Sequence, residues 1–125
     1  MMDLIIEMFV TPGTPEGPYE RMAAAMAHGM VGVLIAAALL RRLADRPWRA
    51  AGLACAIYAS WELAQIIWSG SSFVDSAIDL MAVGCGALIA ACLWARKLPA
   101  IIPLMVLLVV SGRLAPKRRG DGAER

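Results

Sequence analysis

The chain has 125 residues, of which 60% are hydrophobic and 18% are charged, and its mean hydropathy is +0.66. A soluble domain usually carries about 25% charged and about 45–50% apolar residues, so the composition argues against a soluble enzyme and against a disordered chain. The net charge of +2 provides no basic field to attract nucleic acid. We therefore expect a small multi-span protein whose main partner is the lipid bilayer.

Residues 1–18 form the first predicted unit, an amino-terminal arm. Leu4, Ile5, Met8 and Phe9 share one helical face opposite Asp3 and Glu7, and residues 11–18 are rich in proline and glycine. A cleavable signal peptide begins with basic residues, and this segment is acidic. We expect a helix that lies flat on the outer membrane surface and then a stiff connection.

Three apolar runs follow, at residues 22–40, 50–68 and 74–95. Crossing the hydrocarbon core takes about 20 residues, and backbone groups in lipid must be satisfied within the segment, so each run predicts a transmembrane helix. The fourth run, residues 98–110, contains two prolines and reaches only about 20 Å as a helix.

The predicted fold class is therefore all-α: a polytopic transmembrane helical bundle with three full spans plus a short fourth apolar helix. This transmembrane domain is expected over residues 19–112. Residues 113–125 form a basic tail that we expect to be disordered.

Basic residues predict the orientation, because Lys and Arg concentrate on the cytoplasmic side. Four arginines lie between the first two runs, at positions 41, 42, 46 and 49. If the fourth run does not cross, eleven of the twelve basic residues lie inside; if it crosses, six lie on each side. We expect a bacterial inner-membrane protein with its amino end outside, its tail in the cytoplasm, and the fourth run interfacial or re-entrant.

Polar side chains inside the spans are the candidate ligand- or proton-binding residues, because an ionisable group in the membrane usually serves a function. Their predicted depths overlap in the outer half of the membrane. Their spacing follows helical faces, at i, i+4 and i+7 in the second run and at i and i+4 in the third. These residues are His28, Tyr58, Glu62, Gln65, Asp75 and Asp79.

Two of these residues have simpler interpretations. Asp75 fits a solvated helix start, where acids are favoured, and His28 fits an interhelical hydrogen-bond partner.

Small residues in the first and third runs predict close helix packing, either within the chain or between copies. The candidates are Ala25, Gly29, Ala82, Gly86 and Ala90. We expect a homo-oligomer or a subunit of a larger membrane complex.

No metal site or cofactor is predicted, because the chain has one histidine and no C-x-x-C motif. Cys55, Cys85 and Cys92 lie in apolar runs and fit packing positions. No pairing of a nucleophile with a base is apparent, so we expect a protein that is not an enzyme.

The pattern of Glu62 and Gln65, then Asp79, then Gly86 resembles the VanZ-like membrane family. Members of that family are small helical membrane proteins associated with glycopeptide resistance and envelope functions. The resemblance implies a polar hairpin inside the membrane. The chain has Ser71 and Ser72 where that family usually has an arginine, and Val83 where it usually has an asparagine.

Two functions from different classes follow. One is a self-associating membrane protein without catalytic activity, whose architecture also resembles three-span phage holins. The alternative is a VanZ-like envelope protein that binds a cation, an amine or a lipid headgroup in an outer-leaflet pocket.

Overall fold

The computed structural model describes residues 17–114, and all regular structure within that range is helical. The elements are α2 (Pro18–Leu40), α3 (Pro47–Ser69), α4 (Phe73–Trp94), the short 3-10 helix η1 (Leu98–Ala100) and α5 (Ile101–Leu114). Three of them are long and apolar enough to cross a membrane, and the segment Leu98–Arg113 is a shorter apolar helix. The predicted all-α bundle of three spans plus a short fourth helix is confirmed. The expected amphipathic arm and most of the tail lie outside the described residues.

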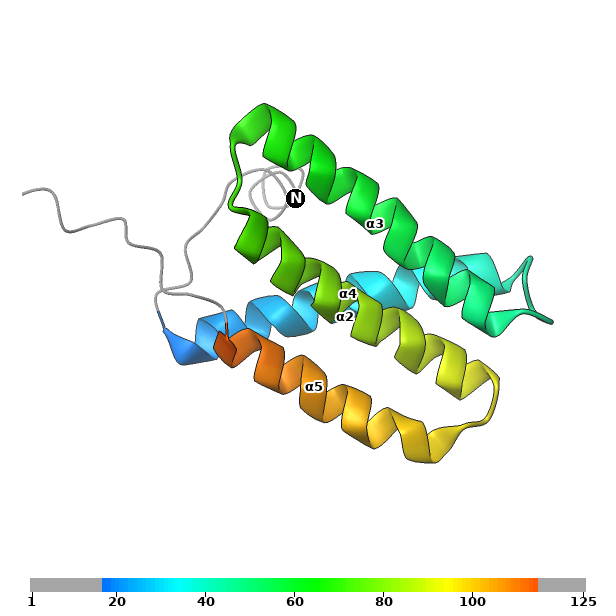
Figure 1. Ribbon diagram of the computed structural model, residues 1–125. Helices are drawn as coiled ribbons and strands as arrows, with labels where there is room; N and C mark the ends of the chain where they lie inside the picture. The colour runs from blue at the N-terminus through cyan, green and yellow to red at the C-terminus, as the bar shows by residue number, and fades with distance from the viewer. Residues whose placement is uncertain (1–16, 115–125) are drawn as a thin grey trace, which may run out of the picture.

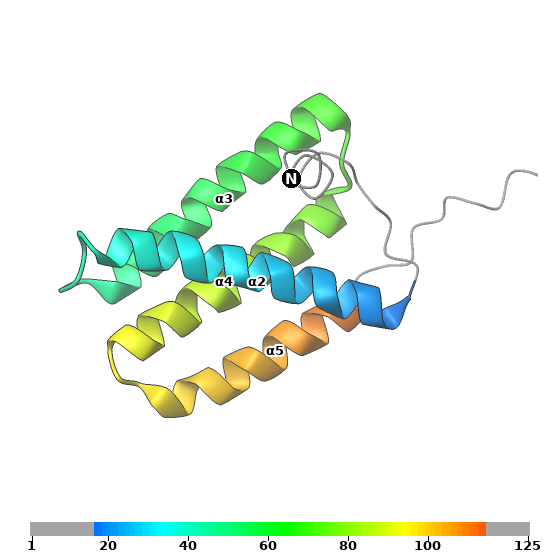
Figure 2. The same ribbon diagram turned by 180° about the vertical axis from the view of Figure 1, so that it is seen from behind.

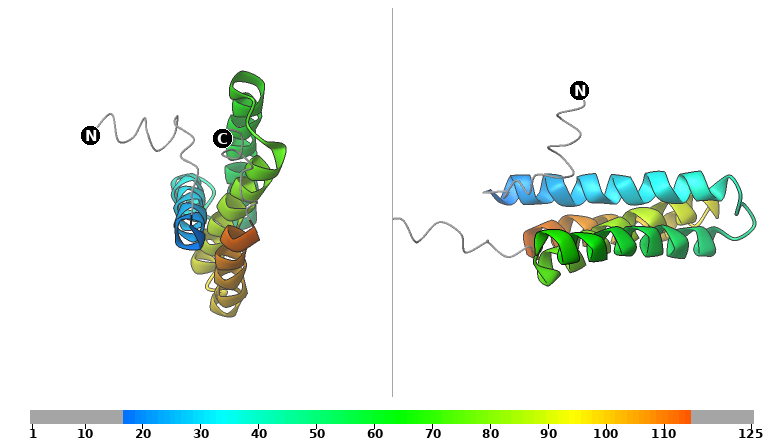
Figure 3. Two further views of the ribbon diagram at one scale, coloured as in Figure 1. Left: turned by 90° about the vertical axis from the view of Figure 1, so that its left-hand side faces the viewer. Right: turned by 90° about the horizontal axis from the view of Figure 1, so that it is seen from above.

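The helices form two layers (Figures 1 and 3). α3, α4 and α5 lie side by side with α4 in the middle, and α2 crosses one face of this layer over α4. Seen from behind, α2 covers the centre of the layer (Figure 2). Because each helix reverses the direction of the one before it, α2 and α4 run the same way and α3 and α5 run the opposite way. α4 contacts all three other long helices and is the most buried of the candidate spans.

Prolines lie where these helices begin. Pro18 and Pro47 occupy the first turns of α2 and α3, and Pro103 is the third residue of α5. The first turn of a helix has no intrahelical acceptor for its N–H groups, so a proline there removes no hydrogen bond. The two prolines of the fourth run therefore start a helix rather than break one.

Residues in the left-handed region end two of the helices. Gly70 has φ +67° after α3, and Arg96 has φ +56° after α4. Beyond Arg96, the Lys97 N–H donates to the Cys92 carbonyl oxygen at 2.8 Å, which is the Schellman pattern of a helix end. The Cβ of Arg96 makes this left-handed conformation sterically unfavourable, whereas glycine, which has no Cβ, adopts it freely.

Two backbone contacts hold α2 against α4. A Cβ at Gly86 would collide with the backbone carbonyl of Gly29, and a Cβ at Gly32 would collide with the carbonyl of Val83. Only glycine fits at both positions, so the two helices approach more closely than larger residues would allow. The predicted packing residues Ala25, Gly29, Ala82, Gly86 and Ala90 are all buried within this one chain.

α5 packs lengthwise along the bundle instead of lying across it. Leu108 covers Gly29, with a Cβ built at Gly29 falling 2.8 Å from the leucine Cδ2. A Cβ at Gly112, one turn further on, would lie 2.8 Å from the Cα of Met22. The end of α5 therefore lies beside the start of α2.

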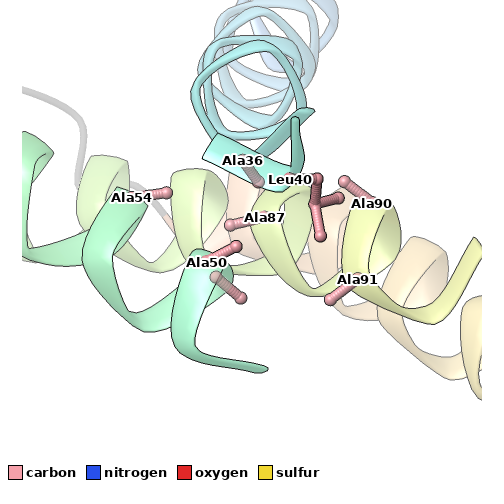
Figure 4. Packing of buried hydrophobic residues seen from close by; sticks show 8 residues of the cluster. Ala36, Leu40, Ala50, Ala54, Ala87, Ala90 and Ala91 are labelled. Atoms are coloured by element: carbon pink, nitrogen blue, oxygen red, sulfur yellow. The ribbon is translucent and has the colours of Figure 1, made fainter. Parts of the chain in front are cut away.

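The two ends of the bundle differ. We call the end with the start of α2, the α3–α4 turn and the end of α5 the polar end, and the other the alanine end. At the alanine end, small side chains of α2, α3 and α4 meet in a dry cluster (Figure 4). The buried members are Ala36, Leu40, Ala50, Ala51, Ala54, Ala87, Ala90 and Ala91.

Contacts between helix ends and loops close the alanine end. The indole N–H of Trp94 donates to the Ala44 carbonyl oxygen at 2.9 Å, which joins the end of α4 to the α2–α3 loop. The ammonium of Lys97 lies 5.3 Å from the centre of the Trp48 ring, within range of a cation–π interaction.

Candidate functional site

An imidazole–carboxylate pair joins α2 to α4. His28 Nδ1 lies 3.5 Å from Asp79 Oδ1 and 2.9 Å from the carbonyl oxygen of Ala24. Because a carbonyl oxygen only accepts, the contact with Ala24 places a proton on Nδ1. Both side chains of the pair are about one-third exposed, at 31% and 33%. The pair is thus a partly exposed polar contact inside an apolar bundle.

A second polar pair lies on α3. Tyr58 and Glu62 lie four residues apart on the same face of α3, and Tyr58 is within electrostatic range of the carboxyl groups of both Glu62 and Asp79. Glu62 is 6% exposed and Tyr58 is 7% exposed. A carboxyl group buried this deeply needs a polar partner, and the Tyr58 phenol is the polar group beside it on the same helix face.

The two pairs form one site. The rings of His28 and Tyr58 meet edge to face, with centroids 6.1 Å apart and an interplanar angle of 75°. Three helices therefore contribute: α2 supplies the imidazole, α3 the phenol and a carboxyl, and α4 the second carboxyl. We call His28, Tyr58, Glu62 and Asp79 the polar cluster.

The polar cluster lies towards the polar end, on α3 and α4. Asp79 comes six residues after the start of α4 and Glu62 seven residues before the end of α3, which are distances of about 9 and about 10 Å along the helices. His28 lies further from its helix end, about 15 Å, because α2 begins at Pro18 and extends beyond the hairpin of α3 and α4.

Two predicted site residues lie nearer the α3–α4 turn. Asp75 is half-buried in the first turn of α4, the position where an acid interacts favourably with the helix dipole. Gln65 is half-buried one turn beyond Glu62, and its backbone carbonyl accepts a hydrogen bond from Ser69 Oγ at 2.6 Å. Both lie between the polar cluster and the α3–α4 turn.

The sequence prediction missed the contribution of α5. Leu108 covers Gly29, next to His28, and Ser111 is fully buried with its hydroxyl donating to the Leu108 carbonyl at 2.7 Å. The available signal was a pair of small residues, Ser111 and Gly112, in an otherwise bulky apolar run. Small residues of this kind indicate a helix face that packs closely against another helix. Arg21 was missed as well: its Nε is buried and has no hydrogen-bond partner among the described residues.

The side chains of the described residues were compared with the arrangement of a metal centre. Within residues 17–114, no three His, Cys, Asp or Glu side chains come together as metal ligands would. The three cysteines carry free thiols and lie in α3 and α4.

Comparisons with known proteins found no matching family model, no matching curated protein and no matching solved structure.

Proposed function

We propose that this chain is a membrane-embedded binding protein that holds the ammonium group of a lipophilic amine at the polar cluster. The observation that carries the proposal is the partly exposed His28–Asp79 pair beside the buried Tyr58–Glu62 pair. An ionisable group within a membrane helix costs a few kcal/mol or more, so two carboxyl groups in one site need compensation. A bound cation provides that compensation.

The side chains of the cluster match an ammonium group. The carboxylate oxygens of Asp79 accept hydrogen bonds from N–H donors, and a charge-assisted bond of this kind is about twice as strong as a neutral one. The Tyr58 ring lies beside His28, and the face of a tyrosine ring attracts a cation. The chemistry is binding without bond making, because no nucleophile is paired with a base here.

The depth of the site argues that the ligand carries an apolar body. Asp79 lies about 9 Å along α4, below the level at which lipid headgroups and aromatic anchors gather. An amine with a hydrocarbon or aromatic body reaches this depth by partitioning into lipid. An inorganic cation would have to lose its hydration on the way.

The packing favours this function over the holin-like alternative. Self-association was expected through the small-residue faces, yet Gly29 and Gly86 contact each other inside the chain. The dry cluster of the alanine end also separates the polar cluster from the opposite membrane face. We infer a binding site that opens on one face of the membrane.

Two further observations from the sequence support the proposal. Glu62, Gln65 and Asp79 are the residues that carry the resemblance to the VanZ-like family, and Glu62 and Asp79 belong to the polar cluster. The arginines flanking the first span favour an inner-membrane protein whose α2 begins outside, in which case the site opens outwards.

Isothermal titration calorimetry on the full chain in lipid nanodiscs tests the proposal. The probes are phenethylammonium and 2-phenylethanol, which have similar shapes and differ in charge. We expect saturable binding of the ammonium only. Glu62→Gln and Asp79→Asn should each weaken it at least about thirtyfold, because removing one partner of a desolvated charge pair costs about 2–5 kcal/mol.

The matched control is Asp45→Asn, which removes an exposed carboxylate in the α2–α3 loop that pairs only with its neighbour Arg46. Its affinity for phenethylammonium should equal that of the wild type. Equal binding of the alcohol, or full affinity in both site variants, would refute the proposal. Circular dichroism and gel filtration confirm that each variant is folded.

A further inference from the structure

We infer that the alanine end of the bundle binds the phosphate group of an anionic phospholipid. The inference rests on a set of exposed cations that two loops hold together at the level of the lipid headgroups. It concerns the end opposite the polar cluster, so it does not depend on what the polar cluster binds.

Six exposed basic side chains surround the alanine end. The α2–α3 loop, the start of α3 and the turn after α4 meet at this end (Figure 1). Among the described residues there, Asp45 is the only carboxylate, and it pairs with Arg46 at 3.2 Å. Six cations against one carboxylate leave a formal charge of +5. We call the six residues the basic rim: Arg41, Arg42, Arg46, Arg49, Arg96 and Lys97.

Two contacts hold cations of the two loops close together. The Trp94 indole donates to the Ala44 carbonyl oxygen, which fixes the turn after α4 against the α2–α3 loop. The Lys97 ammonium lies 5.3 Å from the centre of the Trp48 ring, and Arg49 is the next residue along α3. Charges closer than about 8 Å still repel each other at physiological salt. An anion that lies between the two loops therefore stabilises this arrangement.

Helix dipoles account for only part of the basic rim. Arg41 and Arg96 follow the carboxyl ends of α2 and α4, where a cation is favoured. Arg46 and Arg49 are the N-cap and the third residue of α3, where the dipole disfavours a cation, and the first turn of α3 holds no acidic residue. Asp45 neutralises one of these two charges. The other is left for an anion from outside the chain.

The neighbouring tryptophans indicate that this anion is a lipid headgroup. Trp48 is the second residue of α3 and Trp94 the last of α4, and both are about half exposed, at 46% and 52%. Tryptophan gathers at the headgroup level of a bilayer, so the basic rim lies where lipid phosphates are concentrated. The planar guanidinium group of arginine matches the oxygens of a phosphate. A headgroup without an ammonium of its own leaves its phosphate free for these arginines.

Arg96 separates lipid binding from stability. It keeps a left-handed conformation, φ +56°, that glycine adopts without steric cost. Unfavourable conformations of this kind cluster at binding sites, where the side chain is needed. Arg96→Gly removes one cation of the basic rim and relieves the backbone at the same time. This variant should therefore be more stable than the wild type and bind the lipid more weakly.

Native mass spectrometry of the full chain in detergent micelles tests the inference. The probes are dioleoylphosphatidylglycerol and dioleoylphosphatidylcholine, which share their acyl chains and differ in net charge. The first molecule of the anionic lipid should bind at least about fivefold more tightly. Arg49→Gln, Arg96→Gly and Lys97→Gln should each weaken that binding about fivefold, because one cation near a membrane surface contributes about 1 kcal/mol. Binding of the zwitterionic lipid should not change.

The matched control is Arg113→Gln, which removes an exposed cation in the last turn of α5, at the polar end. It should bind the anionic lipid as the wild type does. sn-Glycerol 3-phosphate, a phosphate without acyl chains, should neither bind nor displace the lipid; displacement would make the ligand a free anion and overturn the inference. Equal affinity for the two lipids, full affinity in the three variants, or an equal loss in Arg113→Gln would overturn it as well. No readout involves an amine, so this inference and the proposed function can fail separately.

Discussion

The contact between Gly86 and Gly29 gives a quantitative prediction for one added methyl group. In Gly86→Ala the new Cβ would lie 2.6 Å from the carbonyl carbon of Gly29 and 3.0 Å from its Cα, and would overlap its oxygen. These are backbone atoms, so no side-chain rotation relieves the collision. α2 and α4 must move apart along their crossing.

The expected magnitude follows from two opposing terms. Alanine is favoured over glycine by about 1 kcal/mol in a helix interior, and overpacking a tight contact costs about 1–3 kcal/mol. Because the obstacle is backbone, we take the upper part of that range and expect a net loss of about 1–2 kcal/mol. The folding equilibrium constant of Gly86→Ala should therefore fall about 5- to 30-fold.

Two matched variants isolate the collision. Gly52→Ala, on an exposed face of α3, meets nothing within 4 Å, and Gly84→Ala, also on α4, meets Cys55 Sγ at an ordinary 3.6 Å. Both should be as stable as the wild type or more stable. Unfolding by sodium dodecyl sulfate in mixed micelles, followed by circular dichroism, measures all three. If Gly86→Ala lies within about 0.5 kcal/mol of Gly52→Ala, the inferred close contact between α2 and α4 is wrong.

Three further predictions concern the helix ends and α5. Arg96→Gly should raise the free energy of unfolding by about 1 kcal/mol, because glycine adopts the left-handed conformation without steric cost; an unchanged midpoint in the same micelle assay would contradict this. Trp94→Phe removes the hydrogen bond to Ala44 and should cost about 0.5–1.5 kcal/mol, visible as faster proteolysis of the α2–α3 loop. Gly112→Leu should displace α5 from Met22 and expose the fourth helix to a lipid-soluble photolabel, while α2–α4 stay helical; unchanged labelling would count against the packing of α5.

The sequence predicted the spans well because each is a long apolar run bounded by charged residues, proline, glycine or serine. Differences at the ends come from local chemistry. α2 begins at Pro18 rather than at residue 22 because proline suits a first turn and the Glu20 carboxylate accepts a hydrogen bond from the Gly17 N–H at 3.2 Å. A hydropathy plot does not detect either effect, because Pro18 and Glu20 are not apolar on that scale.

Part of the candidate site was also predictable. Helical spacing placed Tyr58 and Glu62 on one face, and the overlapping depths expected for His28 and Asp79 agree with their 3.5 Å contact. The direction in which α5 runs was not predictable from charge. Basic residues after a helix favour the cytoplasmic side of the membrane, and this preference says nothing about how the helix packs. What holds α5 in the bundle is the fit of Leu108 and Gly112 against α2, and such a fit depends on three-dimensional shape.

The dry alanine cluster has an electrical consequence. Its buried side chains are all apolar and offer water no hydrogen-bond partner, so a transmembrane voltage would fall across protein there. A cation that moves from the polar end to Asp79 passes about 9 Å along the 22-residue α4, roughly a quarter of the span. At about 2.3 kcal/mol per elementary charge per 100 mV, that path corresponds to about 0.6 kcal/mol, or roughly a threefold change in occupancy for each 100 mV. An energised membrane would therefore raise or lower the occupancy of the site about threefold per 100 mV, according to which face the polar end meets.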